Sequence, residues 1–349
     1  MADIDIRISG QTGRITLNRP KALNALTYAM CLEIESALDA WRDNPQVKMI
    51  VIDAAGERAF CAGGDIAEMY ASGTQGDFEY GRKFWRDEYR MNARLFEFPK
   101  PVASFMQGFT MGGGVGVGCH ASHRVVGDSS QIAMPECGIG LVPDVGGSYL
   151  LAHAPGRLGE YLGTTGTRMK AADAILAGFA DYHISETDWP ALIRELEETG
   201  DWTKIDKAAQ SPPDGRLKEL LAPINRNFAG DSLYDILRAL ENDESAFAAD
   251  TLKIMRRNAP LSMACTVEMV HRLRSSNSIR PALEMEYRFT SRSMEHADFL
   301  EGIRAAIIDK DRAPKWKHDL GDPLSLEVTK MLMPLPKGAD QVTFQEDEK

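Results

Sequence analysis

The stretch from Phe109 to Gly147 combines a glycine-rich loop with two acidic residues in apolar surroundings. It contains the run Thr110-Met111-Gly112-Gly113-Gly114-Val115-Gly116-Val117-Gly118, and later Met134-Pro135-Glu136 and Pro143-Asp144-Val145-Gly146-Gly147. Glycines let a backbone approach a ligand closely and present its N–H groups. Backbone donors beside two part-buried carboxylates indicate acyl chemistry, in which an oxyanion is stabilised and protons are moved.

A second loop, Phe60–Asp65, has the same construction as Phe109–Gly114. Each follows a predicted buried strand and enters a predicted helix, so each can present an N–H group at a positive helix end. If the N–H groups of Gly64 and Gly113 converge, they form an oxyanion hole, in which each donor contributes about 10²–10³ in rate. Each loop alone is typical of a tight strand-to-helix turn, whereas the two loops together with nearby carboxylates favour a function.

Three acidic residues are candidates for the chemistry. Glu136 lies between Pro135 and Cys137, an apolar setting that raises the pKa of a carboxyl and suits acid–base or nucleophilic work, although it could also be a capping acid. Asp144 directly precedes a predicted helix, where its simplest role is that of an N-cap. Glu88 belongs to a charged run on a predicted helix, which is typical of a solvated face.

The elements that would position these residues alternate along the first half of the chain. Hydrophobic patterning predicts strands at 4–8, 13–17, 49–52, 102–106 and 124–126, and helices at 27–44, from about 65, 77–98 and 112–119. Thr27 can serve as the N-cap of the first helix. This is an α/β pattern in which the order strand-strand-helix recurs. After Gly146 the pattern is mostly helical, with a break at Pro212-Pro213-Asp214-Gly215.

We therefore expect three regions. Residues 1–210 form the core that carries the candidate site, residues 211–334 form a helical C-terminal region, and residues 335–349 form a loose acidic tail.

Composition excludes several classes of function. The net charge of −11 disfavours a nucleic-acid partner, because no general basic face is available. The five cysteines are scattered without C-x-x-C spacing, so we expect no metal site, no redox pair and no cofactor. Neither a phosphate-binding P-loop nor a G-x-S-x-G elbow is present, and the Gly114-Val115-Gly116 start of a dinucleotide fingerprint is not completed.

The start of the sequence, Met1-Ala2-Asp3-Ile4-Asp5, has neither the basic nor the apolar segment of a secretory signal. No apolar run approaches the roughly 20 residues of a membrane span. We expect no membrane partner and a cytoplasmic location in a bacterium or, as a second choice, a processed protein of the mitochondrial matrix.

On these residues the chain resembles the crotonase (enoyl-CoA hydratase/isomerase) superfamily. The segments that carry the resemblance lie in the family's order over residues 10–180: Ile15-Thr16-Leu17-Asn18-Arg19-Pro20, Leu23-Asn24-Ala25-Leu26, Phe60-Cys61-Ala62-Gly63-Gly64-Asp65-Ile66, Gly112-Gly113-Gly114 and Pro135-Glu136. The resemblance implies a spiral of β-β-α units, a CoA thioester substrate and an oxyanion hole from the amides of Gly64 and Gly113. It further implies contacts of CoA with Lys21, Ala22, Leu23, Ala62, Gly63, Asp65 and Ile66, and it leaves a homo-oligomer open.

Within this superfamily the chain closely resembles the 3-hydroxyisobutyryl-CoA hydrolases. Hydratases of the superfamily use two glutamates, and this sequence has Gly116 at the position of the first and Glu136 at that of the second. Asp144 stands where hydratases typically carry glycine. Further similarities lie at Glu88 and in three C-terminal segments: Asp298-Phe299-Leu300-Glu301-Gly302-Ile303-Arg304, Asp309-Lys310-Asp311 and Pro314-Lys315-Trp316. One departure is Cys137, where relatives often have Thr.

The resemblance thus implies hydrolysis of a short β-hydroxyacyl-CoA, with 3-hydroxyisobutyryl-CoA of valine breakdown as the best candidate. Glu136 would attack the thioester or activate water, Asp144 would hold the substrate's hydroxyl or the water, and Glu88 and Gly113 would contact the acyl part. The alternatives are an enoyl-CoA hydratase or isomerase, which Gly116 disfavours, and a non-catalytic acyl-CoA-binding protein.

Overall fold

The computed structural model describes residues 2–344 of the chain, which divide into two compact units. The first unit comprises the residues up to Asp65 together with Arg90–Ala133 and Arg168–Lys218. The second comprises Ile66–Tyr89, Met134–Thr167 and the residues from Glu219 onward. Each unit has a hydrophobic core of its own.

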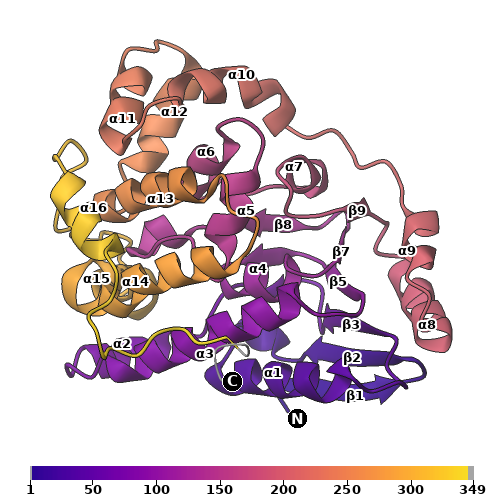
Figure 1. The fold of residues 1–349 in the computed structure, drawn as a ribbon. Helices are drawn as coiled ribbons and strands as arrows, with labels where there is room; N and C mark the ends of the chain where they lie inside the picture. Colours follow the sequence, from indigo (N-terminus) through magenta and orange to yellow (C-terminus); the bar gives the residue numbers. More distant parts are fainter. Residues whose placement is uncertain (1, 345–349) are drawn as a thin grey trace. The chain divides into compact units, whose positions relative to one another are not determined.

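Two sheets form the centre of the first unit (Figure 1). The six-stranded sheet has the order β1 (Ile4–Ser9), β2 (Thr12–Leu17), β3 (Met49–Ala54), β5 (Val102–Met106), β7 (His123–Val126) and β9 (Tyr182–His183). The three-stranded sheet has the order β4 (Ala59–Cys61), β6 (Phe109–Met111) and β8 (Gln131–Ala133). Only the β1–β2 hairpin is antiparallel among these strand pairs.

A repeated pattern of two strands and a helical segment links the two sheets. The chain enters the large sheet at β3, β5 and β7, and each time the next strand, β4, β6 or β8, joins the small sheet before a helical segment follows. Parallel neighbours in both sheets require such crossovers. This arrangement confirms the predicted spiral of β-β-α units, and the expected strands of the first half are all present.

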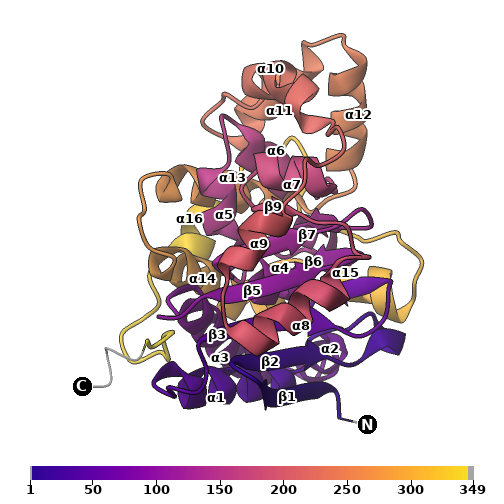
Figure 2. The same ribbon diagram turned by 90° about the vertical axis from the view of Figure 1, so that its right-hand side faces the viewer.

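Helices cover the large sheet because its strands are apolar on both faces. The helices α8 (Trp189–Thr199) and α9 (Thr203–Ala208) lie along it in Figure 2, and Trp189, Leu196 and Ile205 pack against strand residues such as Phe105. The other helices of this unit are η1 (Pro20–Ala22), α1 (Tyr28–Arg42), α4 (Gly113–Gly118) and α7 (Ala171–Leu176). As predicted, α1 is capped by Thr27, whose hydroxyl accepts a hydrogen bond from the Met30 N–H.

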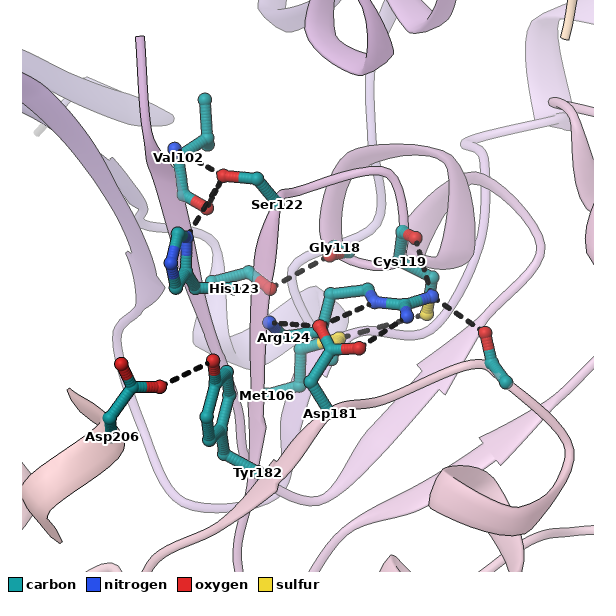
Figure 3. Close-up of polar contacts among 12 residues, drawn as sticks. Val102, Met106, Gly118, Cys119, Ser122, His123, Arg124, Asp181, Tyr182 and Asp206 are labelled. Atoms are coloured by element: carbon teal, nitrogen blue, oxygen red, sulfur yellow. Dashed lines mark hydrogen bonds and ion pairs between the residues drawn. The ribbon is translucent and has the colours of Figure 1, made fainter. Parts of the chain in front are cut away.

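Polar side chains fasten strand β7, next to the edge strand β9 of the large sheet (Figure 3). The Arg124 guanidinium donates to the Asp181 carboxylate, with Nε 2.8 Å from Oδ2, and thereby joins β7 to the segment before β9. The Ser122 hydroxyl lies 2.9 Å from the Val102 amide nitrogen and contacts His123. In addition, the Ser104 hydroxyl donates to the Gly118 carbonyl at 2.7 Å, which ties the end of α4 to β5.

The second unit is almost entirely helical, as expected for the C-terminal part of the chain. Its elements are α2 (Ala67–Gly73), η2 (Glu136–Ile139), α5 (Gly147–His153), α6 (Leu158–Thr165), α11 (Leu233–Glu241), α12 (Ala246–Met255), α13 (Pro260–Leu273), α14 (Arg280–His296), α15 (Phe299–Ile303), η3 (Arg304–Ile308) and α16 (Ser325–Leu332). Two helices, α3 (Glu79–Phe96) and α10 (Leu217–Asn227), contribute residues to both units. Helices α5 and α6 approach closely because Gly159 has no side chain; a Cβ there would lie 2.0 Å from the Leu151 carbonyl oxygen.

Most of residues 335–344 are exposed, but a few of them contact the rest of the second unit. Val342 and Phe344 are buried, the Arg280 guanidinium lies over the Phe344 ring, and Asp340 pairs with Arg86 at 3.1 Å. Residues 345–349 of the expected tail lie outside the described residues. No helix among residues 2–344 has the length and apolar character needed to cross a membrane.

Candidate active site

The two glycine loops leave adjacent parallel strands of the small sheet. Strand β4 pairs with β6, with Cys61 opposite Thr110, so the segments that follow both strands begin side by side. Contact between the loops is close: a Cβ on Gly114 would lie 2.1 Å from the Cys61 carbonyl oxygen. The predicted pair of loops therefore exists, and only glycine fits at position 114.

Gly64 and Gly113 have different local roles. Gly113 is the first residue of α4, where backbone N–H groups have no acceptor within the helix. The preceding Gly112 has φ 49°, in the region that favours glycine. Gly64 forms an isolated bridge with Leu26, in which the Leu26 N–H donates to the Gly63 carbonyl at 2.9 Å. The two amides remain candidates for an oxyanion hole.

The segments expected to contact CoA in the first unit are held together by backbone hydrogen bonds. The Ala62 N–H donates to the Leu23 carbonyl at 3.0 Å, and the Asp65 N–H donates to the Leu26 carbonyl at 2.8 Å. Leu23 and Asn24 have φ 52° and 54°, which turns the chain sharply after η1 and its Lys21 and Ala22. Ile66 belongs to the second unit. Their contacts with CoA stay predictions.

Glu136 is a buried acid at the start of η2. Its carboxyl is hydrogen-bonded to the backbone of Glu136 itself, in the first turn of η2, and among the described residues none hydrogen-bonds its Oε2. Burial, and then the charge of Asp144, raise the pKa of Glu136 well above its ordinary value. A desolvated carboxylate with one oxygen left without a hydrogen bond is a strong base and nucleophile once it is ionised.

Asp144 is hydrogen-bonded to a tyrosine rather than to a helix start. The Tyr89 hydroxyl donates to Asp144 Oδ2 at 2.7 Å, and both residues are buried. Burial raises the pKa of Asp144 to about 7, against the opposing effect of the Tyr89 hydrogen bond. The interpretation of Asp144 as an N-cap is wrong, because Gly146, with φ 80°, occupies the N-cap position of α5.

Glu88 is also buried, at 3% exposure, so the charged run on α3 is not a solvated face at this position. No described residue hydrogen-bonds its Oε1. Its pKa is raised well above the ordinary value by burial, then by the charges of Asp144 and Glu286. The charged run gave the expectation of a solvated helix face. Helical spacing instead places Glu88 on the inward face of α3, together with Trp85 and Tyr89.

Two residues of this cluster, Tyr89 and Glu286, were not singled out from the sequence. Glu286, on α14, is fully buried and accepts hydrogen bonds from the amides of Gly146 (2.8 Å) and Ser148 (3.1 Å) and from the Ser148 hydroxyl. Its pKa is raised to about 8, mainly by burial. The sequence contains one signal for Glu286: it is an acid on a helix face that is otherwise apolar, with Ala282, Leu283 and Phe289.

The second unit therefore gathers four buried carboxyl groups, those of Glu88, Glu136, Asp144 and Glu286. None of the charges that shift their pKa values is a cation. Such a cluster cannot ionise completely near neutral pH, so it can both hold and release protons. Among the described residues, no three His, Cys, Asp or Glu side chains are arranged to hold a metal ion. The expectation that no cofactor is needed stays a prediction.

A spiral of β-β-α units, paired glycine loops and buried acids together define an acyl-CoA-transforming enzyme of the crotonase type. The chain belongs to the enoyl-CoA hydratase/isomerase family, whose model matches residues 12–331.

Curated relatives of this chain are 3-hydroxyisobutyryl-CoA hydrolases. The chain is 37% identical over 331 residues to a mitochondrial 3-hydroxyisobutyryl-CoA hydrolase of Gallus gallus, covering 90% of this chain and 84% of the relative. It is 38% identical over 324 residues to the mitochondrial enzyme of the same name from Homo sapiens, covering 88% and 82%.

Solved structures confirm the fold. A structure described as an enoyl-CoA hydratase from Rhodobacter sphaeroides 2.4.1 is 55% identical, with a TM-score of 0.92 over 98% of this chain and 100% of that one. Another, described as a carnitinyl-CoA dehydratase from Mycobacterium thermoresistibile, is 37% identical, with a TM-score of 0.93 over 99% of both chains.

Proposed function

We propose that this chain hydrolyses 3-hydroxyisobutyryl-CoA to 3-hydroxyisobutyrate and free CoA, a step of valine breakdown. The activity of the curated relatives supports the substrate. The observation that carries the chemistry is the buried pair Glu136 and Asp144, in which Glu136 keeps an oxygen without a protein partner. A water molecule or an acyl carbon is the natural occupant of that position.

Glu136 provides the reacting group by one of two balanced routes. As a nucleophile, its carboxylate attacks the thioester carbon and expels CoA thiolate, and water then cleaves the mixed anhydride to the acid and the free carboxyl. As a general base, it takes a proton from water, which attacks the same carbon and expels the same thiolate. Hydroxylamine in the assay separates these routes when its direct reaction with the thioester, measured without protein, is subtracted, because it converts an anhydride into a hydroxamate.

Asp144 and Glu88 act on the acyl part of the substrate. The 3-hydroxyl group is a donor that an ionised Asp144 accepts, or Asp144 orients the attacking water. Glu88 contributes a buried, unpartnered oxygen to the same cluster. Gly64 and Gly113 are proposed as the amide donors to the developing oxyanion, and the segments at Lys21–Leu23 and Ala62–Ile66 as the contacts of CoA.

The second candidate is an enoyl-CoA hydratase, because the relative at 55% identity carries that description. Gly116 opposes it: this buried residue has no side chain to transfer a proton at the position where hydratases have a glutamate. Hydratases use two glutamates to hydrate a double bond, and of these two this chain has only Glu136.

Thiol release distinguishes the candidates. Purified protein is assayed with 3-hydroxyisobutyryl-, 3-hydroxypropionyl- and crotonyl-CoA while free thiol and enoyl absorbance are followed in parallel. We expect rapid thiol release from 3-hydroxyisobutyryl-CoA and little loss of enoyl absorbance from crotonyl-CoA. The reverse pattern supports the hydratase, and neither signal together with tight binding of the esters supports a non-catalytic acyl-CoA-binding protein.

The remaining expectations concern the surroundings of the enzyme. We propose acyl-CoA as its only small-molecule partner, no nucleic-acid or membrane partner, and a bacterial cytosol or a mitochondrial matrix as its location. A homo-oligomer remains open and is measurable by light scattering.

A further inference from the structure

We infer that Glu286 is a positioning residue: it anchors the turn that carries Asp144 and so keeps Asp144 in contact with Tyr89. This inference deepens the proposed function and, in its effect on rate, rests on it. Glu286 lies outside the candidate residues that the sequence indicated, and no step of the proposed chemistry uses it.

The turn after Asp144 is conformationally strained. Val145 has φ 54° and Gly146 has φ 80°, two consecutive left-handed residues, and Val145 is β-branched. A β-branched residue in this region is a rare outlier that the surroundings must hold in place. The turn is closed by the Gly147 N–H, which donates to the Asp144 carbonyl at 2.7 Å. The carboxyl of Asp144 is therefore aimed by a backbone that would otherwise relax.

Glu286 supplies the restraint from another helix. Its Oε2 accepts from the Gly146 N–H, and its Oε1 accepts from the N–H and the hydroxyl of Ser148. The N-cap residue Gly146 has no side chain that could cap α5. The carboxylate of Glu286, which is distant in sequence, accepts the hydrogen bonds from the start of α5 instead. Three donors converge on one carboxylate, which fixes both the left-handed residue and the first turn of the helix.

The same face of α14 also contacts the partner of Asp144. Thr290, one helical turn after Glu286, lies 3.4 Å from the Tyr89 hydroxyl, and the ring of Tyr287 packs edge-on against that of Tyr89 at 6.4 Å. A single helix thus contacts Tyr89 directly and holds the turn that follows Asp144. Displacing the side chain of Glu286 is expected to loosen the turn while Tyr89 remains held.

Among the described residues, the charged groups that shift the pKa values of Glu286 and its neighbouring acids are themselves acidic. Glu88 comes from α3, Glu136 from η2 and Asp144 from the turn, and Tyr89 is the neighbouring phenol. Glu286 becomes charged as pH rises through its pKa of about 8, and that charge raises the pKa of Glu136, whereas a glutamine at this position carries no charge at any pH. A purely structural residue would leave the pH profile where it was.

The test compares Glu286→Gln with Glu160→Gln. Glu160 is a matched control because it is also fully buried in the second unit and hydrogen-bonded, to Arg157 and His271 at 2.9 Å each, but it is not one of the acids in the Glu136 cluster. We expect Glu286→Gln to lower kcat for thiol release by about 10- to 100-fold with little change in KM. The acidic limb of its pH–rate profile should move to lower pH, whereas Glu160→Gln keeps the profile of the parent protein.

A second readout does not depend on activity. Hydrogen exchange at the amides of Gly146 and Ser148 should be faster in Glu286→Gln, and the milder Ser148→Ala, which removes one donor, should give an intermediate exchange rate at Gly146. Unchanged exchange at both amides, or a loss of kcat no larger than that of Glu160→Gln, would overturn the inference. If the parent protein releases no thiol while exchange still responds, the proposed function fails and the anchoring role stands.

Discussion

The hydroxyl of Tyr89 donates a hydrogen bond to Asp144 Oδ2 at 2.7 Å inside the second unit, where both side chains are buried. This contact sets the charge state of Asp144, because a hydrogen bond to a carboxylate favours its ionised form while burial opposes it. The result is a pKa of about 7, which lets Asp144 change charge near neutral pH. The pair joins helix α3 to the turn before α5, and the two residues lie 55 positions apart in sequence.

Replacing Tyr89 by Phe is therefore expected to raise the pKa of Asp144 above about 7. The substitution removes the donor while preserving the ring. Carbon-13 NMR of the labelled aspartate carboxyl measures this pKa directly, and kcat/KM should fall by about tenfold at pH 7. Tyr287→Phe is the control, since that hydroxyl contacts Arg86 instead. An unchanged titration of Asp144 in Tyr89→Phe would contradict the assigned role.

Removing the carboxylate of Glu136 tests the reacting group. Glu136→Gln keeps the size of the side chain but can neither attack a carbonyl nor accept a proton, so kcat should fall by about 10³-fold or more. Affinity for a CoA ester, measured by calorimetry with a non-hydrolysable thioether analogue, should change little. Turnover close to that of the parent protein would reject Glu136 as the reacting residue.

The stability of the protein should fall as pH rises from 6.5 to 8.5. Asp144 and Glu286 have folded-state pKa values raised to about 7 and about 8, so the folded state binds protons that the unfolded state has already lost. Their stabilisation is present at low pH and disappears as pH rises through the folded values. Acids whose pKa is lowered, such as Glu160, lose their stabilisation only at more acidic pH. The pKa of His123 is also lowered, so its contribution to stability rises with pH, but this change lies below about pH 6.5.

The expected loss over this interval is about 3 kcal/mol. Urea unfolding at several pH values measures it, and Glu286→Gln should reduce the loss to about 1 kcal/mol or less because one titrating group is gone. A free energy of unfolding that rises with pH in this interval would show that the acids are ionised in the folded state.

Local signals explain what the sequence predicted well. The strands, the cap at Thr27 and the paired glycine loops depend on residues close to one another in the chain, and hydrophobic patterning and glycine chemistry identify them. The same local rules misassigned Asp144 as a helix cap and Glu88 as a surface charge. For Asp144 the reason is local, because Gly146 takes the N-cap position of α5, whereas Glu88 lies on the buried face of α3.

Contacts between distant segments explain what was missed. Glu286 reaches Gly146 across 140 residues, and Tyr89 reaches Asp144 across 55. No periodicity in either segment predicts such a partner. The Asp298–Arg304 motif was likewise noted only as a similarity, although its structural purpose is now visible: α15 packs directly against η2, the helix that begins with Glu136.

Gly302 makes this last contact testable. A Cβ on Gly302 would lie 2.0 Å from the Ile139 carbonyl oxygen at the end of η2, so Gly302→Ala must displace the turn that holds Glu136. Because a shift of about 1 Å in a reacting group can lower a rate by about 10²-fold, we expect kcat to fall at least tenfold. A Cβ on Gly321, in contrast, would meet no atom within 4 Å beyond its chain neighbours, so Gly321→Ala should keep kcat within about twofold. Thermal melting of both variants separates lost folding from displacement, and a Gly302→Ala enzyme with the kcat of the parent protein would show that Glu136 does not depend on α15.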